Sequence, residues 1–341
     1  MKPFRRLLVA AASSLALLAP GTLAGASAAE QQVVTSIKPV HSLVAGVMEG
    51  VGEPALILQG AGSPHTYSLR PSQARMLAEA DLVFWVGPNM EVFLEKPLGT
   101  LAGDATRVAL AEVDGMTLLD MREGGAFEAH SHGDHGDGHA HEAHEDGHHG
   151  HDHEETHAHD DGHDHHDHGP DAHIWLDPEN AKIMVDAIAE ALGAADADNA
   201  SAYAANAEKL NERIDALAAE VTTELEPVKD RPFIVFHDAY QYFEKRFGLE
   251  AAGSITVSPE VIPGAQRVDE IRTKVSELDA ACVFAEPQFE PRLVEVVTEG
   301  TDAKSGVLDP LGAEIADGKD LYFELIRAMA ASLKKCLAKQ S

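Results

Sequence analysis

The sequence predicts an α/β protein with two lobes, each a mostly parallel four-stranded sheet with flanking helices, and one long helix between them. Two observations predict this fold class. Short apolar runs alternate with helical patterns in both halves of the 341-residue chain, and a long helical pattern with no Gly or Pro before Pro227 separates the halves. Alternating strands and helices are typical of a parallel sheet covered by helices. A chain of this length can also bury two separate cores.

Residues 1–29 have the features of a secretory signal. Basic residues within the first six positions precede the apolar run Leu7–Leu18, and Ala26-Ser27-Ala28 offers a cleavage site. A membrane anchor is the alternative, but this run is shorter than the roughly 20 residues that span a bilayer. No later segment is long enough to span, and no Cys lies near the cleavage site. We therefore expect an exported chain with no lipid anchor and no direct membrane insertion.

The first half of the mature chain shows the expected alternation of strands and helices. The apolar runs predict strands at Val33–Ile37, Pro54–Leu58, Leu82–Val86 and Arg107–Leu110. Helical patterns predict helices at Ser42–Met48 and Pro71–Ala80, and Pro71 with Ser72 forms a helix-start signal for the second of these.

The second half follows the same logic after two longer helices. Asp177 and Pro178 open an amphipathic helix that extends to Leu192, and Asn199–Val228 carries a helical pattern that would span about 45 Å. Strands are predicted at Phe233–Phe236, Gly253–Val257, Cys282–Ala285 and Gly306–Leu308, and helices at Val268–Leu278, Pro291–Glu299 and Leu321–Leu337. We therefore expect an N-terminal lobe at 30–196, a linking helix at 197–228 and a C-terminal lobe at 229–341.

The segment 130–168, within the N-terminal lobe, has the composition of a metal chelator. It holds 16 of the chain's 20 histidines and 12 acidic residues, with no Lys or Arg. The lack of an apolar period predicts a mobile loop, because such a segment cannot bury enough surface to offset the entropy of ordering. Imidazole with carboxylate suits Zn²⁺, Cu²⁺ and Ni²⁺, so we expect auxiliary, weak metal binding here; a solvated acidic linker is the alternative. The histidines concerned are His130, His132, His135, His139, His141, His144, His148, His149, His151, His153, His157, His159, His163, His165, His166 and His168.

Charge and cysteine content limit the function classes further. The formal net charge of −31 disfavours binding to nucleic acid or to anionic membrane surfaces and favours cations. Cys282 and Cys336 are the two cysteines, and an exported pair predicts one disulfide. The alternative, two thiol metal ligands, is disfavoured because neither lies in a C-x-x-C motif or near a histidine.

Several ligand-type residues lie at the ends of expected strands. In open parallel sheets, binding sites lie beyond the carboxyl ends of the strands, so these side chains can converge between two lobes. His65 follows the strand near Leu58, His173 opens Ile174-Trp175-Leu176, His237 follows Phe236, Glu286 follows Ala285 and Asp309 follows Leu308.

These candidates do not carry equal weight. His65, His173 and His237 gain support from one another and from the chelating segment. Asp309 precedes Pro310 and is either a ligand or the cap of a turn. For Glu286, before Pro287, and for His41, on an expected helix, the sequence favours structural roles.

Motifs spread along the whole mature chain carry a family resemblance. They are Ser63–Ser72 (SPHTYSLRPS), Trp175–Pro178 (WLDP), Val235–Tyr240 (VFHDAY), Phe284–Gln288 (FAEPQ) and Leu308–Gly312 (LDPLG). The chain resembles the ZnuA-type zinc-binding receptors of bacterial ABC importers, the cluster A-I or cluster 9 solute-binding proteins, including their acidic His-rich insertion. The resemblance implies a rigid linking helix, a metal site in the cleft between the lobes, a periplasmic location and delivery to the membrane subunit of an ABC permease. We expect a monomer.

The resemblance also implies ligand roles for His65, His173 and His237. Some relatives use a carboxylate just before the first histidine, but Pro64 stands there in this chain. The fourth ligand is then water or Asp309, which matches the carboxylate of manganese-binding relatives. Three imidazoles favour Zn²⁺ over Mn²⁺, and Cu²⁺ would also bind.

The sequence leaves other functions to be weighed against a zinc receptor. One is a periplasmic zinc store or chaperone without a permease, and another is a manganese-type receptor of the same family. A metallohydrolase is disfavoured. The two H-E-x-x-H strings, His144–His148 and His153–His157, lie in a segment without an apolar helix face, and chance explains them in so His-rich a stretch.

Overall fold

The computed structural model describes residues 31–122, 127, 169–256, 263–278, 280–289 and 292–338. The expected signal sequence and the His-rich segment 130–168 lie outside the described residues. The described residues from Gln31 onward belong to one compact unit. Within the described part of the chain, no helix combines the length and apolar character that crossing a membrane requires.

The first half forms a four-stranded parallel sheet, here called the N-terminal sheet, in the order β2-β1-β3-β4. Its strands are β1 (Val33–Thr35), β2 (Ala55–Leu56), β3 (Leu82–Trp85) and β4 (Thr106–Ala109), and its helices are α1 (Lys38–Val47), α2 (Pro71–Ala78) and α3 (Val92–Thr100). All four predicted strands are confirmed. The α3 helix was not predicted, because Pro97 inside it and Gly99 near its end weaken a helical pattern.

The second half forms an equivalent parallel sheet, here called the C-terminal sheet, in the order β6-β5-β7-β8. Its strands are β5 (Phe233–His237), β6 (Ala251–Thr256), β7 (Cys282–Ala285) and β8 (Lys304–Val307), and its helices are α6 (Gln241–Phe247), α7 (Ala265–Glu277), α8 (Arg292–Thr298) and α9 (Leu321–Leu337). The predicted strands are again confirmed. The α6 helix was missed because seven residues are too few for a clear period; Gly248, at φ 69°, ends it.

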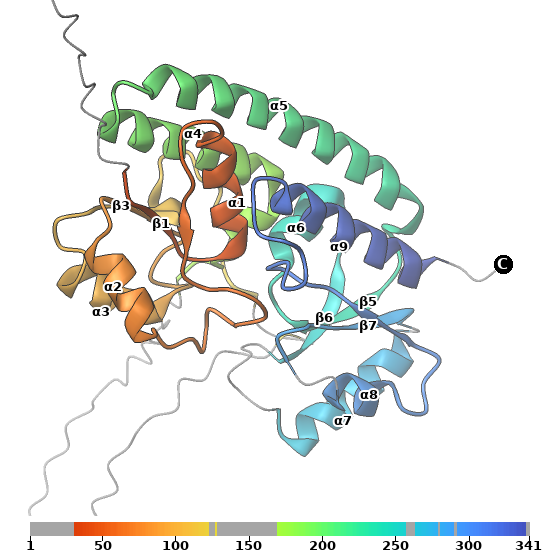
Figure 1. Ribbon diagram of the computed structural model, residues 1–341. Coiled ribbons are helices and arrows are strands. Elements are labelled where there is room, and N and C mark those ends of the chain that lie inside the picture. The colour runs from red at the N-terminus through yellow and green to blue at the C-terminus, as the bar shows by residue number, and fades with distance from the viewer. Residues whose placement is uncertain are drawn as a thin grey trace, which may run out of the picture. The chain divides into compact units, whose positions relative to one another are not determined.

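Two helices connect the sheets in the chain, α4 (Pro178–Ala195) and α5 (Ala200–Leu225), and α5 continues into a 3₁₀ turn at Glu226–Val228. Figure 1 shows α5 in green as the longest helix of the fold. At 26 residues it spans about 39 Å. Its buried side chains recur every three or four residues and are Tyr203, Ala207, Leu210, Ile214, Leu217, Val221 and Leu225. The predicted long helix is confirmed, with both ends within a few residues.

One apolar core is shared by both sheets. Val33, Leu82 and Phe84 of the N-terminal sheet and Phe233 and Phe284 of the C-terminal sheet belong to the same buried cluster, together with side chains of α1, α4, α5 and α9. The opposite faces have their own cores: α2 and α3 cover the N-terminal sheet, and α7 and α8 cover the C-terminal sheet. The shared core ties the two sheets together through packing.

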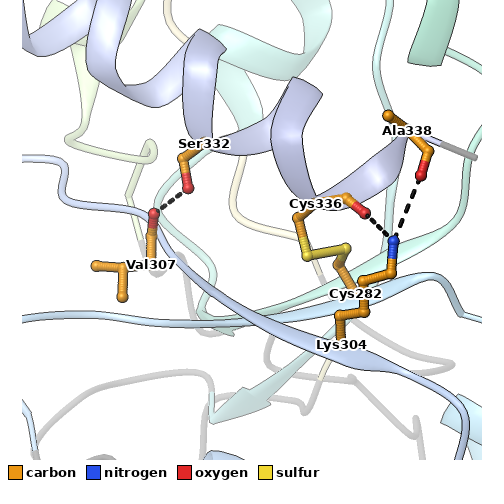
Figure 2. The surroundings of a disulfide bond; sticks show 6 residues. All are labelled: Cys282, Lys304, Val307, Ser332, Cys336 and Ala338. Atoms are coloured by element: carbon orange, nitrogen blue, oxygen red, sulfur yellow. Dashed lines mark hydrogen bonds between the residues drawn. A yellow bond between two sulfur atoms is a disulfide. The ribbon is translucent and has the colours of Figure 1, made fainter. Parts of the chain in front are cut away.

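The predicted disulfide is present. Cys282 of β7 and Cys336 of α9 are joined, and the two cysteines are 54 residues apart in the sequence (Figure 2). Nearby, Lys304 Nζ donates to the Cys336 and Ala338 carbonyls, and Ser332 Oγ donates to the Val307 carbonyl. These contacts attach the last helix to the edge of the C-terminal sheet, and they exclude the alternative of two thiol ligands.

Candidate metal centre

Three histidines that are far apart in the sequence converge beside the carboxyl end of β5. His65 lies in the loop between β2 and α2, His173 precedes the 3₁₀ turn Ile174–Leu176, and His237 is the last residue of β5. Each offers one ring nitrogen, and these nitrogens all lie within 4.8 Å of one another. Nε2 of His173 and Nε2 of His237 are 3.4 Å apart. A tetrahedral zinc ion with Zn–N bonds of about 2.0–2.1 Å separates its ligand nitrogens by about 3.3–3.4 Å.

Two buried carboxylates hold the other nitrogen of two of these rings. His173 Nδ1 lies 2.8 Å from Asp171 Oδ1, and His237 Nδ1 lies 2.6 Å from Glu286 Oε1. An ionised carboxylate can only accept, so each Nδ1 carries the proton and each Nε2 presents a lone pair. This is the arrangement in which an outer carboxylate orients a metal-bound imidazole. Two lone pairs facing each other at 3.4 Å favour a cation between them.

The electrostatic environment differs among the three imidazoles. Burial, with the neighbouring His173 and His237, places the pKa of His65 well below its ordinary value. Burial also acts to lower the pKa of His237, but the Glu286 carboxylate prevails, aided by Asp238 and Asp171, and the net pKa is raised. His65 is therefore neutral and ready to bind a metal at neutral pH, whereas His237 retains a proton to higher pH.

The carboxylate of Asp171 is itself held by the start of α6. Gln241 Nε2 donates to Asp171 Oδ2 at 3.2 Å, and Tyr242 Oη donates to the Asp171 carbonyl at 2.7 Å. Asp171 Oδ1 also accepts from the backbone N–H of His173 at 3.0 Å. His173 is thus oriented by groups that follow His237 closely in the chain.

The wall of the site is largely apolar and leaves little space. A cavity of about 10 Å³ lies against the three histidines, which is room for about one water molecule. Its other lining residues are Ser63, Pro64, Trp175, Glu286, Gln288, Phe289, Pro310 and Leu311. Trp175 Nε1 donates to the Pro310 carbonyl at 2.8 Å, which connects two segments of the cavity wall. A space of this size suits a four-coordinate ion better than an ion that keeps several waters.

Asp309 lies outside the group of converging ligands. Its Oδ1 accepts from the backbone N–H groups of Leu311 and Gly312, both at 3.0 Å, and from Gln288 Nε2 at 2.8 Å, while Oδ2 accepts from Ala313 N–H at 2.6 Å. These bonds are those of a turn cap, one of the two roles that the sequence left open for Asp309. Its oxygens are engaged by four donors, because a carboxylate before Pro310 can accept from the amides of the turn that follows.

The structure also shows where His41 and Glu286 lie, the two residues for which the sequence favoured structural roles. His41 lies on α1, and its Nε2 contacts the Pro54 carbonyl at 3.2 Å, outside the three-histidine group. Glu286 has the structural position that the sequence favoured, but it serves the metal site by orienting His237. Asp171 was not singled out from the sequence; its signal was an Asp two residues before His173, the spacing at which a carboxylate can hold the following backbone.

A buried ion-pair cluster beside His237 was also missed. Arg122 contacts Asp238, and its Nη1 lies 2.8 Å from Glu244 Oε2 on α6. Both carboxylates are buried, so the guanidinium compensates charge that would otherwise be costly. Nothing in the sequence around Arg122 indicated a partner more than a hundred residues away.

Comparison with known proteins identifies the family. The family model described as "Zinc-uptake complex component A periplasmic", ZnuA, matches residues 33–336. The "High-affinity zinc uptake system protein ZnuA" of Brucella suis biovar 1 (strain 1330) is 61% identical over 307 residues, covering 90% of this chain and 92% of that relative. The chain belongs to the ZnuA family.

A second relative supports the same family, and a solved structure supports the fold. The protein of the same description from Paracoccus denitrificans (strain Pd 1222) is 44% identical to this ZnuA-family chain over 328 residues, covering 95% of this chain and 98% of the relative. The solved structure of the periplasmic zinc-binding protein TroA from Treponema pallidum has a TM-score of 0.71 at 17% identity, covering 91% of this chain and all of that one. At this identity the likeness shows the fold.

Proposed function

We propose that this ZnuA-family chain is the periplasmic zinc-binding component of an ABC importer, and that His65, His173 and His237 hold the transported ion. The observation that carries the proposal is the pair of Nε2 lone pairs at 3.4 Å, each fixed by a carboxylate on Nδ1, with a third imidazole nitrogen beside them. Three nitrogen ligands and a cavity with room for one water describe a four-coordinate zinc site. Water, rather than Asp309, then completes the coordination.

The donor set supports zinc over manganese. Mn²⁺ prefers oxygen ligands and six-fold coordination, whereas three imidazoles favour Zn²⁺, with Cu²⁺ as a competitor. The carboxylate that would have made the site more manganese-like, Asp309, accepts four hydrogen bonds from its own surroundings. Cellular selectivity against copper then depends partly on metal availability.

The relatives' names extend the proposal to location and partner. They describe periplasmic, high-affinity zinc uptake proteins. We propose that residues 1–29 direct export, and that residues 30–196 and 229–341 act as two lobes around the site. The exported monomer then delivers Zn²⁺ to the membrane subunit of a permease. Binding followed by release is not a chemical conversion, so the proposal includes no enzymatic step.

Single histidine substitutions test the site. Replacing His173 by Ala should weaken zinc binding at least about tenfold in competition with a chelator, because a neutral imidazole ligand is lost. His65→Ala and His237→Ala should do the same, and His41→Ala is the matched control that should bind as wild type does. If all three variants keep wild-type affinity, the site assignment is wrong. A store without a permease is distinguished by zinc uptake in a permease-deleted strain, which should lose the contribution of this protein.

A further inference from the structure

Lys38, the first residue of α1, is a buried cation whose partners lie almost 280 residues later in the chain. It is only 3% exposed. Its Nζ donates to the Ile315 carbonyl at 2.6 Å and to the Ala313 carbonyl at 3.2 Å, and it lies 3.2 Å from Asp317 Oδ1. Burying an ammonium group is costly unless several acceptors surround it. Here three oxygens of one loop supply them.

That loop, residues 309–317, is held by a negative charge within it, Asp309, and by a positive charge on α1, Lys38. Asp309 accepts from the backbone N–H groups of residues 311–313, and Lys38 donates to the carbonyls of residues 313 and 315. Ala313 joins the two systems, with its N–H on Asp309 and its carbonyl on Lys38. Gly312, at φ 70°, supplies the left-handed conformation that this turn needs.

The same loop forms part of the wall of the metal cavity. Pro310 and Leu311 line the cavity beside the histidines. The Pro310 carbonyl accepts from Trp175 Nε1, two residues after His173. The position of this loop therefore helps to set the size of a space that now admits about one water molecule. Lys38 comes from the N-terminal half of the chain, whereas Asp309 belongs to the loop, so the wall is held both from within the loop and by α1.

We infer that Lys38 is a positioning residue for zinc: by fixing the loop 309–317 across the site, it keeps the cavity too small for additional water and slows release of the ion. This inference rests on the proposed zinc-binding function. Lys38 is not itself a metal ligand, so we expect it to act on the coordination number of the zinc ion and on the rate at which zinc is released. The same tight wall disfavours ions that prefer six ligands.

The test compares Lys38→Met with wild type, because Met keeps most of the volume and removes the three donors. Zinc release, measured by chelator capture, should be about tenfold faster, the low end of effects for groups that support metal ligands indirectly. With Co²⁺ as the probe, wild type should show the strong visible absorption of a four-coordinate site. The variant should absorb more weakly as water joins the ion. Lys38→Arg, which keeps a charged donor, should recover part of the slow release.

Ser42→Ala is the matched control. Ser42 also lies on α1 and makes a buried bond to the C-terminal half, but this bond, from Tyr322 N–H at 2.9 Å, is to α9 rather than to residues 309–317. It should lower stability without changing zinc release or the cobalt spectrum. The inference would be overturned if Ser42→Ala accelerated zinc release as much as Lys38→Met does. It would also be overturned if folded Lys38→Met kept the wild-type rate of zinc release and the wild-type cobalt spectrum.

Asp309 provides a second approach should Lys38→Met not fold. Asp309→Ala frees the loop from the other side and should accelerate release similarly, while Asp309→Asn keeps an acceptor for the amides of Leu311 and Gly312 and should release zinc slowly. Release from Asp309→Asn as fast as from Asp309→Ala would instead indicate a ligand role and contradict the inference. If wild type binds no zinc, the proposed function fails. If wild type binds zinc but the rate of release does not depend on Lys38, only the further inference fails.

Discussion

His173 and His237 face each other through their Nε2 atoms at 3.4 Å, although 64 residues separate them in the sequence. Behind each ring stands a buried carboxylate, Asp171 or Glu286, bonded to Nδ1. The geometry of the pair is therefore set before any metal arrives. Pre-organisation of this kind raises affinity because little ordering remains to be done on binding.

Removing either orienting carboxylate should weaken zinc binding without removing a ligand. Glu286→Gln and Asp171→Asn should each raise the dissociation constant for zinc by about tenfold or more, because the imidazole loses its fixed tautomer and orientation. Competition with a fluorescent chelator measures this. Glu220→Gln, which breaks an exposed ion pair with Arg327, is the control and should bind normally. Normal affinity in both carboxylate variants would contradict the role assigned to the pair.

Zinc affinity should fall as the pH is lowered, beginning above the ordinary histidine pKa of about 6.5. The sign follows from His237: its pKa is raised in the metal-free protein, so a proton competes with the metal at higher pH than at an ordinary histidine. His65, whose pKa is lowered, adds its competition only at more acidic pH. Glu286→Gln removes the main influence that raises the pKa of His237 and should move the decline to lower pH. Affinity that stays constant from about pH 8 to about pH 6 would refute this.

Glu91 should make the stability of the fold depend on pH. Burial raises its pKa from 4.5 to about 7, although Ser36 Oγ and the N–H groups of Val86 and Gly87 donate to it. The folded state therefore binds a proton more tightly than the unfolded state, so this group's contribution to stability falls as the pH rises from about 4.5 to about 7, by roughly 3 kcal/mol at most. The difference in unfolding free energy between wild type and Glu91→Gln should change over that window. A constant difference would mean that Glu91 does not titrate there.

Reduction of the Cys282–Cys336 disulfide should destabilise the protein by about 4 kcal/mol in the chain-entropy treatment of a loop of this length. Denaturant unfolding with and without reductant measures the effect. Zinc affinity of the reduced, folded protein should change little, because neither cysteine lines the metal cavity. Two free thiols in protein isolated from the periplasm would contradict the pairing.

Deletion of residues 130–168 should remove a weak class of zinc sites and leave the tight site intact. The composition of this segment offers many imidazoles but does not favour a packed core, so we expect each ion to bind there with lower affinity than at the three-histidine site. Most of these histidines should titrate near about pH 6.5, so the weak class should disappear by about pH 5.5. Zinc titration of the deletion variant beside wild type checks this, and uptake should suffer mainly when zinc is scarce. Loss of the tight site, or no zinc beyond one ion per wild-type chain, would contradict this account.

The sequence alone determined the strands, most helices and the three converging histidines. Strands such as Leu82–Trp85 and Cys282–Ala285 are continuous apolar runs, and the buried side chains of α5 recur with the helical period. Because the carboxyl ends of parallel strands meet at one edge, His65 after β2 and His237 at the end of β5 could be brought together from their positions. His173 precedes a 3₁₀ turn rather than following a strand, and its place in the group rested on the chelating segment and on the family resemblance. The disulfide followed from two cysteines in an exported chain.

Only the tertiary structure decided which polar groups serve the site and how. Glu286 and Asp309 both follow a strand of the C-terminal sheet closely and precede a proline, yet Asp309 caps the amides of a turn and Glu286 orients His237. Lys38, Arg122 and Tyr242 act on partners far away in the sequence. Periodicity reports which side chains are buried, because burial repeats with local backbone geometry. The partner of a buried charge depends on which distant segments the fold brings together, and local sequence does not encode that directly.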